Sequence, residues 1–208
     1  LWLGSIVFDG ARAFEGVTPD LDLHCARLIA SAQAFGLQSM LSAGEVMELA
    51  LDGVAKFPRG SELYIRPLLF AAEGKGHLSP DPDSTRFALT IFTAPLPAPS
   101  GFSACLSRFR RPGFDFAPTD AKSPCHYPNG ARAVAEAVGK GFDNAVLLDA
   151  EGNVAELATA NLFLVKGGVA ATPKPNGTFL DGITRRRVIA LLRAAGTRVE
   201  ERAIRPEE

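Results

Sequence analysis

The sequence predicts an α+β protein, and three observations lead to this class. Residues 22–37 and 42–57 carry apolar side chains at helical spacing, which predicts two amphipathic helices early in the chain. Residues 85–93, TRFALTIFT, alternate between apolar and polar side chains, as a half-buried strand does. Later helices and strands follow one another without a regular βαβ period, so α+β describes this order better than α/β.

The first half of the chain is expected to contain two helices and then two strands. The first helix ends near Gly36, and its apolar residues are Leu23, Leu28, Ala32 and Phe35. The second helix begins at Ser42, a favoured N-cap residue, and Glu45 follows at the spacing of a capping box. Its expected apolar face comprises Val46, Leu49, Ala50 and Val54. The two strands are expected at residues 61–71 and 85–93.

A proline-rich stretch at residues 94–101, APLPAPSG, follows the second of these strands. Prolines at alternate positions cannot pair inside a sheet, and they favour a stiff, extended path. We therefore expect an interdomain linker here, with a small N-terminal α/β domain at 1–93 and a larger C-terminal domain at 102–208. A proline-rich surface loop within one domain is the alternative.

The second half is expected to mix strands and helices. A hairpin is indicated by Lys166-Gly167-Gly168, which separates two short apolar runs. The last helix is expected to bury Val188, Ile189, Leu191 and Leu192. The expected elements are a strand at 102–107, a helix at 131–139, strands at 144–148, 162–165 and 169–172, a helix at 184–194, and a strand at 198–203.

The composition is that of an ordinary globular protein. Of 208 residues, 47% are hydrophobic and 22% are charged, which is enough apolar mass for one sizeable core or two smaller ones. The net charge of −1 provides no basic field for nucleic acid. Three cysteines without paired spacing favour a reduced, cytoplasmic protein. No apolar run has the length of a membrane span, and no signal peptide is visible.

Three short motifs carry the chemistry of the chain. Lys122 is followed by Tyr127, Glu156 lies within VAELATANLF, and Gly182-Ile183-Thr184-Arg185 opens the last predicted helix. A lysine amine can form an imine, a carboxylate can face a pyridine nitrogen, and N–H groups at a helix start can bind a phosphate. Each motif alone has an ordinary explanation, namely a surface lysine, a strand-end acid and a helix cap. Together, in this order, they favour an enzyme that holds pyridoxal 5'-phosphate covalently.

The chain resembles the class IV aminotransferases, the fold-type-IV pyridoxal-phosphate enzymes, and within them the branched-chain amino-acid aminotransferases most. The motif YIRPLLF favours this group over the D-amino-acid transaminases and the aminodeoxychorismate lyases. The resemblance implies two α/β domains of the D-amino-acid aminotransferase-like type, the second of which binds the cofactor. It rests on FDGARAFEG at 8–16, HCARL at 24–28, YIRP at 64–67, the lysine segment, NLFLVKGGVAATP, and FLDGITRRRV.

The resemblance also assigns roles to the cofactor-binding residues. Lys122 is the catalytic lysine, which forms a Schiff base with the cofactor and then acts as the base for the α-proton. Tyr127 would bond the cofactor's phenolic oxygen, and Glu156 would keep the pyridine nitrogen protonated. The phosphate ligands expected from the resemblance are Arg27, Ile183 and Thr184.

Substrate recognition is expected to involve Phe14, Tyr64 and Arg66. The resemblance places Arg66 near the substrate carboxylate, with Phe14 and Tyr64 lining an apolar side-chain pocket. The chain departs from the usual branched-chain pattern at three positions, Asp9, Arg12 and His126. Arg12 could pair with Asp9 or offer a second carboxylate site, and His126 is expected to be structural.

The function implied is transfer of an amino group between a small apolar L-amino acid and 2-oxoglutarate in a ping-pong cycle, by a homodimer without a metal. The alternatives are a D-amino-acid or (R)-amine transaminase, an aminodeoxychorismate lyase, and a catalytically silent homologue that acts as a binding protein. The chain begins without methionine, and the family's C-terminal phosphate-binding turn is missing after the last predicted strand. We therefore expect it to be truncated at both ends.

Overall fold

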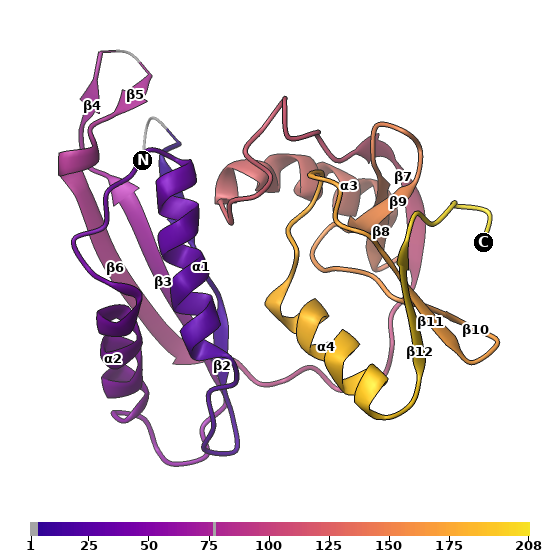
Figure 1. The fold of residues 1–208 in the computed structure, drawn as a ribbon, viewed down its shortest axis with the longest axis horizontal. Helices are drawn as coiled ribbons and strands as arrows, with labels where there is room; N and C mark the ends of the chain where they lie inside the picture. The colour runs from indigo at the N-terminus through magenta and orange to yellow at the C-terminus, as the bar shows by residue number, and fades with distance from the viewer. Residues whose placement is uncertain (1–3, 77) are drawn as a thin grey trace. The chain divides into compact units, whose positions relative to one another are not determined.

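The computed structural model describes residues 4–76 and 78–208; residues 1–3 and 77 lie outside the described part. The chain divides into two compact units (Figure 1). The first comprises the described residues up to Pro99 together with Ala121–Cys125, and the second comprises Ser100–Asp120 and His126–Glu208. The change after Pro99 falls within the proline-rich stretch 94–101. The lysine segment, Ala121–Cys125, belongs to the first unit, although it falls within residues 102–208.

The first unit is built on an antiparallel sheet with β3 (Leu63–Ala71) at its centre. β6 (Thr85–Thr93) pairs with β3 along its whole length. β1 (Ile6–Phe8) and β2 (Ala11–Ala13) pair with β3 in one continuous register, with a break at Asp9 and Gly10. The break falls opposite Pro67, which has no N–H to donate to a neighbouring strand. A short hairpin, β4 (Gly74–Lys75) and β5 (Ser79–Pro80), connects β3 to β6.

Two helices cover one face of this sheet, α1 (Leu21–Ala34) and α2 (Ala43–Val54) (Figure 1). The predicted capping box of α2 is confirmed: Ser42 Oγ accepts the N–H of Glu45, and Glu45 Oε2 accepts the N–H of Ser42. Alternate residues of β3, beginning at Leu63, are buried toward the helices, so the residues between them lie on the other face. The prediction for Leu49 is wrong, because its side chain is 43% exposed.

The second unit contains two three-stranded sheets, each of which has a helix packed against it. The first sheet and its helix are β7 (Ala104–Arg110), β8 (Asn144–Leu148), β9 (Val154–Leu157) and α3 (Tyr127–Gly139). The second are β10 (Leu164–Lys166), β11 (Val169–Pro173), β12 (Arg198–Arg202) and α4 (Ile183–Ala194). β7 and β8 are parallel, with α3 between them in sequence, and β11 and β12 are parallel, with α4 between them.

Small side chains form much of the core between α3 and its sheet. Ala133 and Ala137 of α3 are buried together with Ala145 of β8, and their small side chains allow the helix to approach the sheet closely.

The predicted hairpin is confirmed as β10 and β11, with both glycines of its turn at positive φ. The prediction that Leu191 is buried is wrong: α4 turns this side chain outward, and it is 60% exposed.

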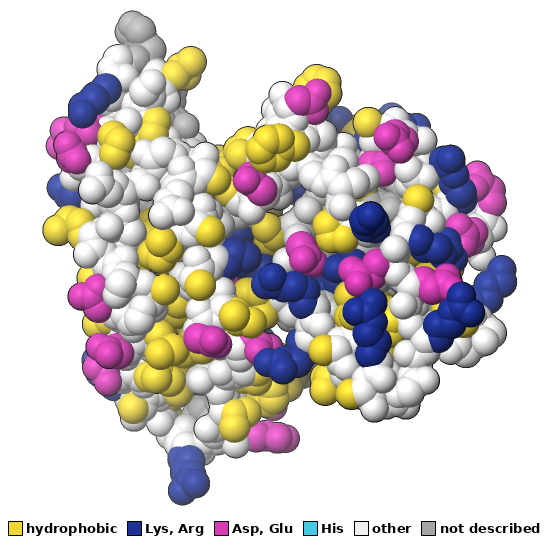
Figure 2. Space-filling view, in the orientation of Figure 1, with side chains coloured by type: hydrophobic (Ala, Val, Ile, Leu, Met, Phe, Trp, Pro, Cys, Tyr) yellow, Lys and Arg dark blue, Asp and Glu magenta, His cyan; other side chains and the backbone are white. Residues whose placement is uncertain are grey.

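The α+β class is confirmed, because both units combine helices with sheets that contain antiparallel strands. Figure 2 shows basic and acidic side chains interleaved on the visible face of the second unit. Ion pairs in this unit join Arg193 to Glu201, Arg198 to Glu200, and Arg202 to both Glu200 and Glu208. In the part of the chain that is described, no helix has the length and apolar character needed to cross a membrane.

Candidate functional site

The residues expected at the site fall in both units, and each group is described within its own unit. The first unit holds Phe14, Arg27, Tyr64, Arg66 and Lys122. The second holds Tyr127, Glu156, Ile183 and Thr184.

The backbone of Lys122 is fixed to the first unit from two sides. Its N–H donates to Ser31 Oγ on α1 at 3.0 Å, and its carbonyl accepts the N–H of Phe8 at 3.0 Å. The next residue, Ser123, is buried and donates its hydroxyl to the carbonyl of Ile6 at 2.7 Å. Three hydrogen bonds to β1 and α1 therefore fix the backbone from which the Lys122 side chain projects.

The Lys122 side chain is half-buried and lies over an aromatic ring. Its Nζ is 5.0 Å from the centre of the Phe8 ring, within the range of a cation–π contact. Sequence reasoning did not select Phe8, because a three-residue strand is too short to show the alternation that identifies a sheet face. Its signal was its position at the start of the FDG motif.

Tyr64 and Arg66 lie on the sheet face opposite the helices, as alternate residues of β3. The Arg66 guanidinium carbon lies 5.1 Å from the Tyr64 ring centre and 5.2 Å from that of Phe92 on β6. The two rings are themselves 5.5 Å apart. Arg66, which was expected near the substrate carboxylate, is thus exposed and rests on two aromatic rings. A Cβ at Gly10 would collide with the Tyr64 hydroxyl. The Tyr64 side chain therefore passes close to the backbone of residue 10, where glycine leaves the space that it needs.

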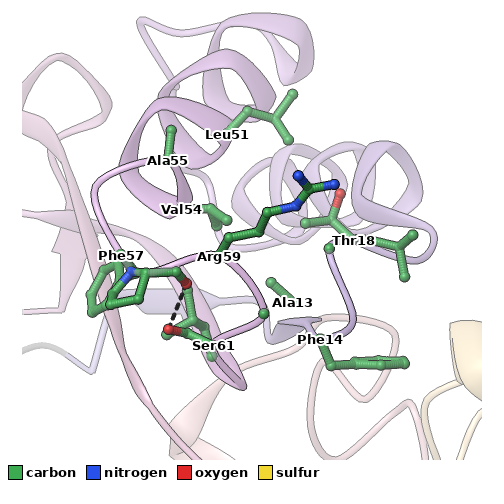
Figure 3. Close-up of a pocket in the computed structure, with 14 residues that line it drawn as sticks. Ala13, Phe14, Thr18, Leu51, Val54, Ala55, Phe57, Arg59 and Ser61 are labelled. Atoms are coloured by element: carbon green, nitrogen blue, oxygen red, sulfur yellow. Dashed lines mark hydrogen bonds between the residues drawn. The ribbon is translucent and has the colours of Figure 1, made fainter.

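Phe14 has different surroundings from these two residues. It lines a pocket of about 290 Å³ formed by the segment after β2, the end of α2 and the loop before β3 (Figure 3). Leu51, Val54 and Phe57 supply apolar walls, and the Arg59 side chain extends toward Thr18 (Figure 3). None of the other expected site residues lines this pocket, so we do not regard it as the catalytic site.

Arg27 is bound to the buried carboxylate of Asp9. Arg27 Nε lies 2.7 Å from Oδ2, and Nη2 lies 2.8 Å from Oδ1. His24 Nδ1 is also 2.7 Å from Oδ1. Burial acts to raise the pKa of Asp9, but hydrogen bonds from Arg27 and His24, together with their charges, outweigh burial and hold this pKa below its ordinary value. The pairing of Asp9 with Arg12 does not form; Arg12 donates instead to the carbonyl of Ala94.

Glu156 is held between two side chains of the second unit. It lies within β9, and its Oε1 is 3.1 Å from Arg111 Nε. Its Oε2 accepts a hydrogen bond from Asn161 Nδ2 at 3.2 Å. The side chains of Arg111 and Glu156 are only 10% and 12% exposed. A carboxylate held in this way can partner a protonated nitrogen.

Ile183 and Thr184 begin α4, as the motif predicted. Gly182 is the N-cap residue and supplies no side-chain hydrogen bond, so the N–H groups of the first turn have no capping side chain. Ile183 is buried, whereas Thr184 is exposed. Arg185 is buried and binds Asp181, Glu201 and the carbonyl of Pro173, which fixes this helix start to β11 and β12.

Tyr127 and His126 lie at the start of α3. The Tyr127 side chain is 55% exposed. His126 Nε2 donates to the carbonyl of Pro118 at 3.1 Å, in keeping with the structural role expected of it. Burial lowers the pKa of His126, and the charge of Arg111 acts in the same direction.

The protein family that matches this chain and the relatives that resemble it are all aminotransferases. The family model described as amino-transferase class IV matches residues 6–208. A probable branched-chain-amino-acid aminotransferase of Rickettsia bellii is 32% identical over 203 residues, which cover 97% of this chain and 70% of the relative. The branched-chain-amino-acid aminotransferase of Pseudomonas aeruginosa is 32% identical over 219 residues, covering 100% and 70%.

Solved structures agree with these matches. An aminotransferase from Brucella abortus bound to the co-factor PLP is 52% identical, with a TM-score of 0.97 over 99% of this chain and 74% of that one. The branched-chain amino acid aminotransferase of Escherichia coli is 31% identical, with a TM-score of 0.91 over 98% of this chain and 70% of that one.

Proposed function

The chain belongs to the class IV aminotransferases, and we propose that it is a pyridoxal-phosphate-dependent transaminase of branched-chain L-amino acids. The placement of Lys122 carries the proposal. Its backbone is fixed by bonds to α1 and β1, and its amine lies over Phe8 on the sheet of the first unit. A lysine held in this way can present a primary amine in one position, which covalent attachment of an aldehyde requires.

The residues present fit pyridoxal phosphate. Lys122 offers the amine, Glu156 offers a nearly buried carboxylate, and the start of α4 offers N–H groups without a capping side chain. A helix start of this kind favours an anion, because its N–H groups and dipole point toward the ligand. When bound, the cofactor would supply an electron sink for the bond that breaks at the substrate's α-carbon.

Each residue then has a separate task. Lys122 would bind the cofactor's aldehyde carbon and, once displaced by substrate, its amine would move the α-proton. Glu156 would hold a proton on the pyridine nitrogen. Ile183, Thr184 and Arg27 would bind the phosphate, and Arg27 can use Nη1 for this purpose, since its contacts with Asp9 use Nε and Nη2.

The substrate class rests on the names of the relatives and on the sheet face that carries Tyr64 and Arg66. We propose that this face supplies an apolar wall and a cation for the second carboxylate of glutamate, with 2-oxoglutarate as the acceptor. Phe14 lines a separate pocket, and we propose that it adds a further apolar contact for the substrate. We also propose a homodimer that works in the cytoplasm.

Attachment of the cofactor to Lys122 is tested by borohydride reduction and peptide mapping. The adduct is expected on the peptide that contains Lys122, and Lys122→Ala should abolish both transamination and the visible absorption band. Lys140→Ala is a matched control, because this lysine lies on the surface in an ion pair with Glu136. An adduct on Lys56, Lys140 or Lys166 would show that the assignment is wrong.

The role of Glu156 is tested by Glu156→Gln, which keeps the shape of the side chain and removes its charge. We expect the rate of transamination to fall roughly a hundredfold, or about 3 kcal/mol of transition-state stabilisation, with a smaller loss of cofactor binding. Glu151→Gln is a suitable control, since Glu151 is an exposed acid in the turn before β9. A rate close to that of the wild type would remove Glu156 from the mechanism.

A panel of amino donors with 2-oxoglutarate and pyruvate separates the possible activities. Leucine, isoleucine and valine are expected to be the best donors. A preference for D-amino acids or (R)-amines would move the protein to a sister activity without changing the cofactor assignments. Cofactor binding without turnover of any donor would indicate a binding protein.

A further inference from the structure

We propose that Asn161 is a positioning residue that fixes the Glu156 carboxylate relative to the loop before α4. The inference rests on the proposed function, in which Glu156 partners the pyridine nitrogen and the start of α4 binds the phosphate. It concerns residues of the second unit alone.

Asn161 links the Glu156 carboxylate to the loop before α4 through one amide group. Its Nδ2 donates to Glu156 Oε2 at 3.2 Å and to the carbonyl of Leu180 at 3.0 Å. A carboxamide NH₂ has two hydrogens, so these two acceptors use both. A single rigid group therefore sets the separation between the carboxylate and the main chain just before Ile183.

Gly182 shows how closely this loop approaches Asn161. A Cβ at position 182 would collide with Asn161 Oδ1. The backbone of Gly182 has φ −64°, a value open to any residue, so the need for glycine here is one of space and not of conformation. The carboxamide thus packs against the N-cap of α4 while it bonds Glu156.

Arg111 forms the other half of this arrangement. Its Nε lies 3.1 Å from Glu156 Oε1 and also 3.1 Å from the carbonyl of Thr178. Arg111 and Asn161 are therefore both bonded to carbonyls of the segment 178–180. Arg111 contributes charge as well as geometry, whereas Asn161 is neutral, so its contribution is to position the carboxylate.

The chemistry explains why the position matters. The pyridine nitrogen and the phosphate belong to one nearly rigid cofactor, so their protein partners must keep a fixed separation to engage both. A displaced carboxylate would lose its hydrogen bond to the nitrogen, and the loss would appear in turnover as well as in affinity.

Asn161→Asp provides the sharpest test, because aspartate has nearly the shape of asparagine. Near pH 8 the introduced carboxylate donates nothing and repels Glu156, so turnover and cofactor affinity should each fall about tenfold or more. Repulsion by Glu156 raises the pKa of the introduced aspartate above its ordinary value of about 3.9, so part of it becomes protonated as the pH falls toward about 5. Protonation removes the repulsion and restores one donor, so the defect relative to wild type should shrink. His126 is present in both proteins, so its titration affects both equally.

Matched controls separate this effect from general damage. Asn161→Ala should show a defect that does not recover at low pH, because alanine has no titrating group. Asn144→Asp should follow the wild-type pH profile, since Asn144 bonds Thr159 and contacts neither Glu156 nor the segment 178–182. Cofactor affinity is measured by quenching of protein fluorescence during titration of the apoenzyme with pyridoxal phosphate.

A defect in Asn161→Asp that is equal at all pH values would overturn the inference, and so would the absence of a defect. If Asn161→Asp does not fold, Asn161→Ala decides through cofactor affinity, which must fall about tenfold while Asn144→Ala keeps the wild-type value. Failure of the proposed function looks different: Lys122→Ala would keep the absorption band and the activity, whatever the Asn161 variants do.

Discussion

Arg27 binds Asp9 through two nitrogens of its guanidinium, at 2.7 and 2.8 Å from the two carboxylate oxygens. Asp9 is fully buried at the break between β1 and β2, and its Oδ1 also accepts the N–H of Gly10 at 2.7 Å. The pair therefore connects α1 to the middle of the sheet edge. A buried carboxylate of this kind stabilises the fold only while its partners remain, and loss of one partner costs about 3–5 kcal/mol.

The Asp9 carboxylate should make stability sensitive to acid. Its folded pKa lies below the ordinary value, so its contribution is present above about pH 4 and is lost as the pH falls through the folded pKa. Asp9→Asn should be less stable at neutral pH, but its unfolding free energy should fall less between about pH 6 and pH 3 than that of the wild type.

Urea unfolding at a series of pH values measures this difference. Glu207→Gln serves as a control, because Glu207 is exposed, and its curve should run parallel to that of the wild type. Parallel curves for Asp9→Asn and the wild type would show that the Asp9 carboxylate does not titrate with folding.

Arg27 should affect cofactor retention more than chemistry. Arg27→Lys keeps a positive charge beside Asp9, so the fold should survive, but it replaces a planar fork with a single ammonium. We expect weaker retention of pyridoxal phosphate after dialysis and recovery of most activity when excess cofactor is added. A folded variant whose activity does not respond to added cofactor would exclude Arg27 from phosphate binding.

The fold could be predicted from the sequence where elements are long. The capping box at Ser42 identified the start of α2 within a residue, and the alternation at residues 85–93 matched β6. β1 and β2 have three residues each, which is too few to show a period, so they were not predicted. The contacts of Asp9 and Phe8 were missed for the same reason, since both depend on these two strands.

Contacts between residues that lie far apart in the sequence could not be predicted either. Arg66 was expected near the substrate carboxylate, and its ring contacts were not predicted. In the structure Arg66 is exposed, and Phe92, far along the sequence on β6, supplies a ring beneath its guanidinium. Arg111 and Asn161 were not selected for a similar reason: their contacts with Glu156 appear only once three loops and β9 have packed.

Two leucines of similar sequence context should respond very differently to truncation. Leu28 on α1 is completely buried in the core of the first unit, and Leu28→Ala should lower the unfolding free energy by about 2–5 kcal/mol. Leu191 on α4 is largely exposed, so Leu191→Ala should change the unfolding free energy by less than about 0.5 kcal/mol. Denaturant unfolding of each variant checks both values, and a large loss in Leu191→Ala would contradict the outward orientation of this side chain.

The last prediction concerns the two substrates that a transaminase of this class must accept. The proposed apolar wall beside Tyr64 gains about 0.8 kcal/mol for each buried methylene, so leucine should exceed alanine in kcat/KM by about one to two orders of magnitude. Arg66 lies on the rings of Tyr64 and Phe92, and in the proposed function it supplies the charge that binds the second carboxylate of glutamate. Arg66→Ala should therefore reduce kcat/KM for glutamate at least about tenfold more than for leucine.

A comparison with Arg86→Ala isolates this effect, because Arg86 lies on the neighbouring strand β6 and contacts neither ring in the described structure. Phe92→Leu should produce a weaker version of the same change, since it removes one of the two rings that hold the guanidinium, a contact of about 0.5–1 kcal/mol at an exposed site. Equal losses for glutamate and leucine in Arg66→Ala would mean that the arginine binds the carboxylate common to both substrates, and the cation for the second carboxylate would then have to be sought elsewhere.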